Sequence, residues 1–364
     1  MTEQPIYVPI LKGKEGEFAA LQELKSDIRA LIMPLIEIPS VPRDYTNDLP
    51  AKSLDDHLAG IPEKLGKCNL ARPLYLDLPS YGEAEHLADG RLGLDALLAD
   101  CTRYGVIAIP VVSRASSDNY LSVAGLHTKS SDCGICVRLV EKDFSEDIDT
   151  DAEVARVLRG VGASQSTPID LILDLREIGS EGNRDIVFSR YVFSLIPHKD
   201  AWRRIILAAA SFPENLSELD AATTVLLPRR EWNLWKTLQR KPNSLPRKDL
   251  IYSDYAIANP VSKELDPRTM RMSANIRYAT EDHWLIVKGR NVRQYGFSQY
   301  FELSEALVKR PEYYGRNFSW GDTYIDDCAL AMKGPGNATT WRKVGVNHHL
   351  TLVAKQLANL PPGS

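Results

Sequence analysis

Residues 168–178 read P-I-D-L-I-L-D-L-R-E-I, an apolar run that leads into the charged side chains of Asp174, Arg176 and Glu177. The run is too short for a typical helix and lies between a proline and a glycine, which is typical of a fully buried parallel strand. Parallel α/β folds place their chemistry at the carboxyl ends of such strands. The charged end of this segment is therefore predicted to face a functional site.

Apolar segments of the same kind recur along the chain, and several of them also end in an acid. The segments are residues 6–11, 32–38, 74–78, 105–113, 135–140, 168–178, 203–211 and 250–256. Helical spacing between them predicts helices at 17–28, 92–101, 149–160, 186–196 and 229–238. Eight strands with intervening helices predict an α/β fold of the (β/α)8 TIM-barrel-like type, within its usual length range. A doubly wound open α/β sheet is the alternative, because the sequence does not show whether the sheet closes.

The pattern changes near residue 273. The next segments predict a β-hairpin over 274–289 and helices near 298–308, 324–332 and 348–360. We therefore expect a barrel over residues 1–270, followed over residues 271–364 by a β-hairpin and a helical C-terminal cap. The cap is expected to pack on the barrel as part of one structural unit.

Composition narrows the class of protein. Of 364 residues, 44% are hydrophobic and 25% are charged, as in ordinary globular chains that form a packed core. The formal net charge of −4 argues against non-specific nucleic-acid binding. The chain has no apolar span of 18 residues and no signal-like N-terminus, which predicts a cytoplasmic protein with no membrane association.

The cysteines do not indicate a metal or redox site. Among five cysteines the one close pair is Cys133 and Cys136, and no second pair accompanies it to complete a zinc tetrahedron. Residues 135–139 alternate as a strand, whereas a redox C-x-x-C motif normally opens a helix. Reduced structural thiols are therefore expected.

In a barrel, polar residues at the ends of the strands converge on one mouth. These residues are Lys12, Glu37, Asp77, Arg138, Asp174, Ser211 and Asp254. We predict Glu37, Asp77, Asp174 and Asp254 as catalytic acids or bases, and Lys12, Arg138, Ser211 and Tyr255 as ligand-binding residues. Opposed acids and bases in a low-dielectric cup shift one another's pKa values, which suits acid–base chemistry. The alternative is that these charges form a structural ion network.

The sequence does not identify a cofactor. Several carboxylates could hold Mg²⁺, although no spacing-specific motif supports it. Zinc is disfavoured, because the adjacent His348 and His349 would point about 100° apart on a helix and no H-E-x-x-H motif is present. No residue is therefore assigned as a metal ligand.

The C-terminal stretch T-T-W-R-K-V-G-V-N-H-H, residues 339–349, is dense in functional side chains. One histidine is expected to titrate near neutral pH at the mouth and the other to be a structural hydrogen-bonding group. We assign His348 as catalytic. The ligand-binding set is completed by Arg277 and Lys288 of the hairpin and by Trp341, Arg342, Asn347 and His349. Trp320 and Asp322 are expected to mark the start of a helix.

Several motifs together resemble the "beta protein" family of phages, prophages and phage satellites. They are Y-V-P-I-L-K-G-K-x-G-E at 7–17, S-F-P at 211–213, S-D-Y at 253–255, N-I-R-Y…W-L-I-V-K-G at 275–289, F-S-W-G-D at 318–322 and T-T-W-R-x-x-G-x-N-H-H at 339–349. The resemblance implies an accessory protein of a mobile element, in a family with some members encoded beside toxin-like or anti-phage partners. It implies no catalytic residue.

Two functions from different classes follow. The first is an accessory protein linked to anti-phage defence or toxin–antitoxin immunity, with a small anionic ligand at the barrel mouth and a protein partner encoded in the same locus. Its interface anchors would be Trp232, Trp235, Tyr313, Tyr314 and Trp320, although W-x-x-W at helical spacing also fits packing on the barrel. The second is a barrel hydrolase or lyase that acts on a small phosphate-bearing or anionic substrate.

Overall fold

Eight parallel strands form a closed barrel in the computed structural model, which describes residues 4–78, 86–179, 189, 191–194, 196, 201–240, 245–261 and 272–360. The strand order is β1-β11-β9-β8-β7-β6-β5-β2, and β1 pairs with both β2 and β11, which closes the sheet. The strands are β1 Tyr7–Leu11, β2 Leu35–Glu37, β5 Leu74–Asp77, β6 Ala108–Val112, β7 Ile135–Val140, β8 Ile169–Glu177, β9 Arg204–Ala210 and β11 Ile251–Asp254. All eight predicted strands and the TIM-barrel-like fold are confirmed, and the open sheet is excluded.

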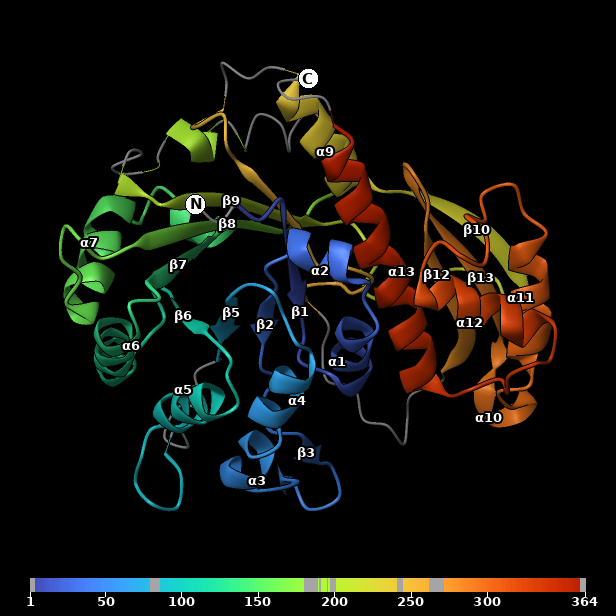
Figure 1. Ribbon diagram of the computed structural model, residues 1–364, viewed down its shortest axis with the longest axis horizontal. Coiled ribbons are helices and arrows are strands. Elements are labelled where there is room, and N and C mark those ends of the chain that lie inside the picture. Colours follow the sequence, from blue (N-terminus) through green and yellow to red (C-terminus); the bar gives the residue numbers. More distant parts are fainter. Residues whose placement is uncertain are drawn as a thin grey trace.

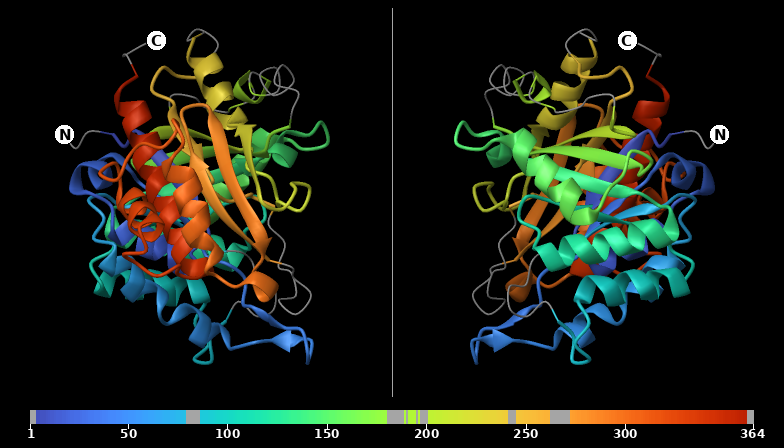
Figure 2. Two further views of the ribbon diagram at one scale, coloured as in Figure 1. Left: turned by 90° about the vertical axis from the view of Figure 1, so that its right-hand side faces the viewer. Right: turned by 90° about the vertical axis from the view of Figure 1, so that its left-hand side faces the viewer.

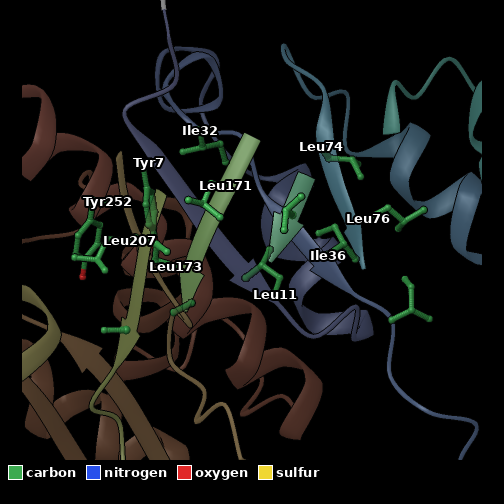
Figure 3. Close-up of a cluster of buried hydrophobic side chains, with 14 of the residues drawn as sticks. Tyr7, Leu11, Ile32, Ile36, Leu74, Leu76, Leu171, Leu173, Leu207 and Tyr252 are labelled. Carbon is green, nitrogen blue, oxygen red and sulfur yellow. The ribbon is translucent and has the colours of Figure 1, made fainter. Parts of the chain in front are cut away.

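Side chains alternate between the two faces of each barrel strand, and this alternation determines which of the predicted site residues point into the barrel. One buried cluster consists almost wholly of strand residues, such as Val8, Leu35 and Tyr75, and fills the barrel interior. The alternate positions, such as Leu11, Ile36 and Leu76, belong to a second cluster that also contains helix residues. Figure 3 shows part of this outer layer. Inward parity therefore belongs to residues 12, 37, 77, 138, 174 and 255, and outward parity to residues 211 and 254.

A buried ion network fills the barrel interior at the amino ends of the strands. Asp170 of β8 accepts hydrogen bonds from Tyr75 at 2.9 Å, from Arg203 at 2.6 and 2.8 Å and from Arg204 at 3.1 Å. The phenol and guanidinium groups satisfy both carboxylate oxygens, so this charge is tolerated inside the barrel. The end of the barrel opposite the predicted site is thus filled by structural side chains.

Helices cover the outside of the barrel (Figure 1). They are α1 Glu15–Gln22, α2 Ser26–Leu31, α3 Leu54–Leu58, α4 Ile61–Lys67, α5 Gly93–Arg103, α6 Asp118–Ser131, α7 Thr150–Val161 and α9 Arg230–Gln239, with a short two-stranded ribbon of β3 Arg43–Asp44 and β4 Leu49–Pro50 before α3. The helix predicted at 17–28 is in fact two helices, because Lys25 adopts an extended backbone conformation between them. Helices α3, α4 and α6 were not predicted. The helix predicted at 186–196 lies largely outside the described residues. Within the described part of the chain, no helix has the length and apolarity needed to cross a membrane.

The C-terminal part contains a three-stranded antiparallel sheet in the order β10-β13-β12. The predicted hairpin is confirmed as β12 Ser273–Ala279 and β13 His283–Asn291. The third strand, β10 Thr223–Pro228, was not predicted and comes from the segment between β9 and α9. The boundary predicted at residues 270 and 271 lies outside the described residues, and the domain division stays a prediction. Because of β10, however, the C-terminal sheet includes a strand from the predicted barrel segment.

Four helices complete the C-terminal part: α10 Val292–Tyr295, α11 Gln299–Val308, α12 Trp320–Ala329 and α13 Ala338–Ala358. Helix α12 begins at Trp320 as predicted, whereas α13 begins ten residues before the predicted position. Figure 1 shows α13 running diagonally between the barrel and the C-terminal sheet, and the left view of Figure 2 shows it beside the strands of that sheet. The close approach of α1 to α13 requires a glycine at position 16, since a Cβ on Gly16 of α1 would lie 2.7 Å from the Thr339 carbonyl oxygen of α13.

Candidate functional site

The guanidinium of Arg138, on the inward face of β7, is the centre of the barrel mouth. Nη1 donates to Glu37 Oε1 at 2.7 Å and to Asp77 Oδ2 at 2.5 Å. Nε and Nη2 donate to Asp174 Oδ2 at 3.0 and 2.5 Å. The side chain of Arg138 is only 6% exposed, so three carboxylates from three strands meet one buried cation. Burial without such partners would cost several kcal/mol per charge.

Two further predicted residues complete this network. Lys12, directly after β1, donates to Glu37 Oε2 and, at 3.3 Å, to the carbonyl of Pro260. The hydroxyl of Tyr255, directly after β11, accepts from Arg138 Nη2 at 2.7 Å and donates to Asp174 Oδ2 at 2.5 Å. Lys12, Glu37, Asp77, Arg138, Asp174 and Tyr255 are thus brought together, and all have inward parity.

A local backbone turn places a second arginine above the first. Arg176 has φ of 58°, a left-handed conformation that costs a residue with a side chain about 1–3 kcal/mol. The Asp174 carboxylate accepts from the Arg176 backbone N–H at 2.9 Å and holds the turn. The Arg176 guanidinium makes one long hydrogen bond of 3.4 Å to Tyr255 and lies 3.9 to 4.0 Å from Asp174 and Glu37. Its side chain is 39% exposed and faces the opening of the barrel.

Beside these arginines lies a cavity of about 390 Å³. Its lining comes from the ends of β5, β6, β7 and β8, and comprises Asp77, Ser113, Arg114, Ala115, Arg138, Val140, Glu141, Lys142, Asp143 and Arg176. Arg114 is paired with Asp143 at 2.9 Å, and Asp143 also accepts from the Val140 N–H. The volume is within the range of small-molecule sites.

The carboxylates at the mouth differ in their electrostatics. Burial acts to raise the pKa of Glu37, but Arg138 and Lys12 outweigh it and lower that pKa to about 2. Burial raises the pKa of Asp77 against the opposing effect of Arg138, and the negative charge of Glu37 adds to the increase. Two neighbouring acids whose pKa values move apart are the arrangement in which one can hold a proton while the other stays ionised.

Two residues predicted at the mouth, Asp254 and Ser211, lie instead on the outer face of the barrel, so their predicted position is wrong. Asp254 accepts from Tyr7 at 2.5 Å, from Tyr252 at 3.1 Å and from His349 Nε2 at 2.8 Å. Burial acts to raise the Asp254 pKa, yet His349 and these hydrogen bonds lower it to about 2. Ser211 donates to Glu231 and accepts from the backbone N–H of Arg230 at 3.1 Å, so it fixes the start of α9.

His348, predicted as catalytic, is fully buried away from the mouth. Its Nδ1 lies 2.9 Å from Asp322 Oδ2 and its Nε2 lies 2.8 Å from the Ala279 carbonyl oxygen. Its ring stacks on Tyr278 with centroids 3.8 Å apart. The carboxylate and the carbonyl contact the two ring nitrogens, and Tyr278 covers one face of the ring. His348 therefore joins α13 to α12 and β12. The F-S-W-G-D and N-H-H motifs therefore meet in a structural contact.

The remaining residues predicted to bind a ligand also make structural contacts. Lys288 donates to the carbonyls of Leu216 and Leu219 in the segment after β9. Trp341 stacks on Tyr300 with centroids 4.2 Å apart. Asn347 accepts from the Gly321 N–H and donates to the Ala20 carbonyl, and so links α12, α13 and α1.

Arg277 of β12 and Arg342 of α13 both contact the barrel part of the chain. Arg277 donates to the Ile257 carbonyl at 2.9 Å and covers the ring of Phe212, with its guanidinium carbon 4.7 Å from the centroid. Burial and then the positive charge of Arg342 lower the Arg277 pKa to about 10. Arg342 faces Glu17 at 3.7 Å. Arg277 thus fixes the segment that follows Tyr255.

The proposed interface tryptophans on α9 are buried. Trp232 and Trp235 both pack edge-on against Tyr252, each with centroids 5.4 Å away. The W-x-x-W pattern therefore stabilises the packing of α9 on β11 and is not an exposed anchor. In the described part of the chain, no group of three or more histidine, cysteine or acidic side chains has the arrangement of a metal site.

The sequence prediction missed part of the cavity. The predicted site does not include Arg176, Ser113, Arg114, Lys142 and Asp143, although they line the cavity. Their signal is positional, since Ser113 ends a predicted strand and Arg114, Lys142 and Asp143 each follow a predicted strand within three residues of its end. In a barrel the loops after the strands build the site, so these loop positions are candidate site residues as much as the strand ends are.

Comparison with protein families supplies one match. A family model described as Beta protein matches residues 7–355, nearly the whole chain. Comparison with curated proteins returned no match. The match covers the barrel and the C-terminal part together.

Proposed function

The chain belongs to the Beta protein family, which suggests a phage-associated protein, and from this premise we propose that it is an accessory protein whose barrel mouth binds a small anionic ligand. The observation that carries the proposal is the position of Arg176 beside the cavity. Among the described residues, the contacts of its guanidinium are all long ones. A strained backbone turn holds the side chain in this position. Strain of this kind persists where the surrounding structure enforces it, and it is concentrated at functional sites.

The surroundings of the cavity favour an anion. Lys142 and Arg114 line it together with Arg176, and Arg138 lies at its base. Three carboxylates line the cavity: Asp77 accepts from Arg138, Asp143 is paired with Arg114, and Glu141 is exposed beside Lys142. Guanidinium groups bind phosphate and carboxylate oxygens through paired N–H donors, which gives geometric specificity. A small phosphate-bearing molecule is the ligand class that we propose.

A thermal-shift screen tests this proposal with inorganic phosphate, sugar phosphates and nucleotides as ligands. A ligand at 100 times its Kd should stabilise the folded protein by about 2.7 kcal/mol, which raises the melting temperature. The increase should disappear in Arg176→Ala and persist in Arg103→Ala, a matched control whose side chain is 75% exposed on α5. An equal increase in both variants, or none in the wild-type protein with any of these anions, would contradict the proposal.

A hydrolase or lyase is the second candidate, and the separation of the Glu37 and Asp77 pKa values favours it. An acid that retains a proton beside an ionised neighbour is suited to general acid catalysis. The link to anti-phage defence or toxin–antitoxin immunity, and the protein partner encoded in the same locus, stay predictions from the family resemblance. Co-purification of the tagged protein with neighbouring gene products tests the partner, and Arg176→Ala should leave such a complex intact.

A further inference from the structure

The three carboxylates around Arg138 are not equivalent in their hydrogen bonding. Asp174 uses both oxygens, since Oδ2 accepts from Arg138 and Tyr255 and Oδ1 accepts from the Arg176 N–H. Glu37 also uses both, with Arg138 on Oε1 and Lys12 on Oε2. Asp77 accepts from Arg138 through Oδ2, and no described residue donates a hydrogen bond to its Oδ1.

Asp77 is also the carboxylate that a ligand can reach. Its side chain is 22% exposed and lines the cavity, whereas the side chains of Glu37 and Asp174 are 14% and 0% exposed and do not. The oxygen to which no described residue donates therefore belongs to the one carboxylate of the three that borders the cavity. A ligand in the cavity would meet Asp77 before either of the other two acids.

The charges of the mouth balance only when Asp77 is ionised. Three cations, Lys12, Arg138 and Arg176, contact three carboxylates, Glu37, Asp77 and Asp174. A proton on Asp77 removes one negative charge and leaves a net positive charge beside the cavity. An anion bound there would consequently favour the protonated form of Asp77.

The other described charged groups near Asp77 do not change this balance. On the cavity side Arg114 is paired with Asp143, and Glu141 and Lys142 are adjacent residues of opposite charge at the exposed rim. Cys136 is an inward neighbour of Asp77 in the barrel, and burial raises the pKa of its thiol well above the ordinary value, so it stays neutral. Burial likewise raises the pKa of Asp77.

We propose that Asp77 takes up one proton from solvent when an anion binds, and that Asp77 Oδ1 then donates a hydrogen bond to an oxygen of the ligand. The inference rests on the proposed anion site and narrows its ligand class. A tetrahedral dianion of the phosphate monoester or sulfate type presents one oxygen to Arg176 and another to the protonated Asp77. The proton returns to solvent when the ligand leaves, so binding is proton-coupled.

Sulfate is a suitable probe, because it stays a dianion across the pH range in question and its own titration does not interfere. Sulfate affinity is measured by calorimetry from pH 5 to pH 8, in buffers that differ in ionisation enthalpy. Wild-type protein should take up a proton on binding, and its affinity should fall as pH rises, by at most about tenfold per pH unit for one coupled proton.

Asp77→Asn gives the decisive comparison. Asparagine resembles the neutral, donating form of Asp77, so the variant should bind sulfate without proton uptake and with little pH dependence. At pH 8 it should bind more tightly than the wild-type protein. Asp100→Asn, a matched change beside Arg103 on α5, should behave as wild type.

The outcomes separate the two proposals. If wild-type protein and Asp77→Asn bind sulfate with the same pH profile, the proposed role of Asp77 is wrong and the anion site stands. If neither binds sulfate although both remain folded by circular dichroism, the anion site of the proposed function fails, and with it the inference. Weaker binding by Asp77→Asn at every pH would show that the carboxylate acts as an acceptor, which also overturns the inference.

Discussion

At the scale of single residues, Arg138 stabilises the buried carboxylates of the barrel mouth. Its guanidinium faces Glu37, Asp77 and Asp174 in a setting where its own side chain is 6% exposed. Removal of one member of a buried ion group leaves uncompensated charges and typically costs 3–5 kcal/mol. Arg138→Met should lower the free energy of unfolding at pH 7 by roughly this amount, as measured in urea.

The pH dependence of this loss follows from the carboxylates that remain. Arg138 acts to lower the pKa values of Glu37 and Asp77. Without it these buried carboxyl groups should have folded-state pKa values above the unfolded values near 4, so the folded state would bind more protons than the unfolded state. The penalty is therefore small below pH 4 and grows as pH rises towards 7. The difference between Arg138→Met and wild type should be smaller at pH 5 than at pH 7, while Arg103→Met should change stability by less than about 0.5 kcal/mol at both. A loss for Arg138→Met that is the same at the two pH values would count against this account of the mouth.

The inward or outward orientation of strand residues explains which site residues could be predicted from the sequence. Asp174 and Asp254 both follow apolar strands, yet Asp174 alternates with Ile172 of the interior and Asp254 with Tyr252 of the outer layer. Both faces of a barrel strand are buried, so the apolar pattern does not reveal which face is inward. The sequence could predict the strands and the polar residues at their ends, among them Lys12, Glu37, Asp77, Arg138 and Asp174. It could not predict that Asp254 faces outward.

At the scale of elements, the motifs at 318–322 and 339–349 form a buried hydrogen-bond network that joins helices α12 and α13. Asp322, near the start of α12, accepts from the hydroxyls of Tyr278 and Ser319 at 2.7 and 2.5 Å and contacts His348 of α13. Dense polar side chains at 318–322 and 339–349 look like chemistry in the sequence, because a buried structural network uses the same residue types as an active site. Only the burial of His348 and the saturation of its two nitrogens distinguish the two cases.

Asp322→Asn tests this joint. An amide in place of the carboxylate has one acceptor oxygen for three donors, so we expect a loss of about 3 kcal/mol in the free energy of unfolding. A double-mutant cycle with His348→Gln should show a coupling of about 0.5–3 kcal/mol between the two residues. Asp326→Asn, in the same helix and paired with Arg316 at the surface, should cost less than about 1 kcal/mol. Additive effects of the Asp322 and His348 changes would refute the joint.

At the scale of the whole molecule, the barrel and the C-terminal part share one core. Trp284 of β13 and Val346 and Leu350 of α13 belong to the same buried cluster as Tyr7 and Tyr252 of the barrel. His349 adds a polar link, since it donates to Asp254 and stacks on Trp284 with centroids 5.0 Å apart. Strand β10, which leaves the barrel segment to pair with β13, adds a third connection. The family match over both parts is consistent with a single inherited unit.

This shared core predicts one cooperative unfolding transition, although chains of this length often unfold in stages. Two native cysteines report on the two parts: Cys136 lies inside the barrel and Cys328 within the C-terminal helices, and both are fully buried. Labelling of each thiol during urea unfolding, followed by mass spectrometry, should give the same midpoint for both. His349→Ala, which leaves Asp254 without its imidazole partner, should lower both midpoints together. Modification of Cys328 at a lower urea concentration than Cys136 would instead show that the C-terminal part unfolds first, and that its contacts with the barrel contribute less than their burial implies.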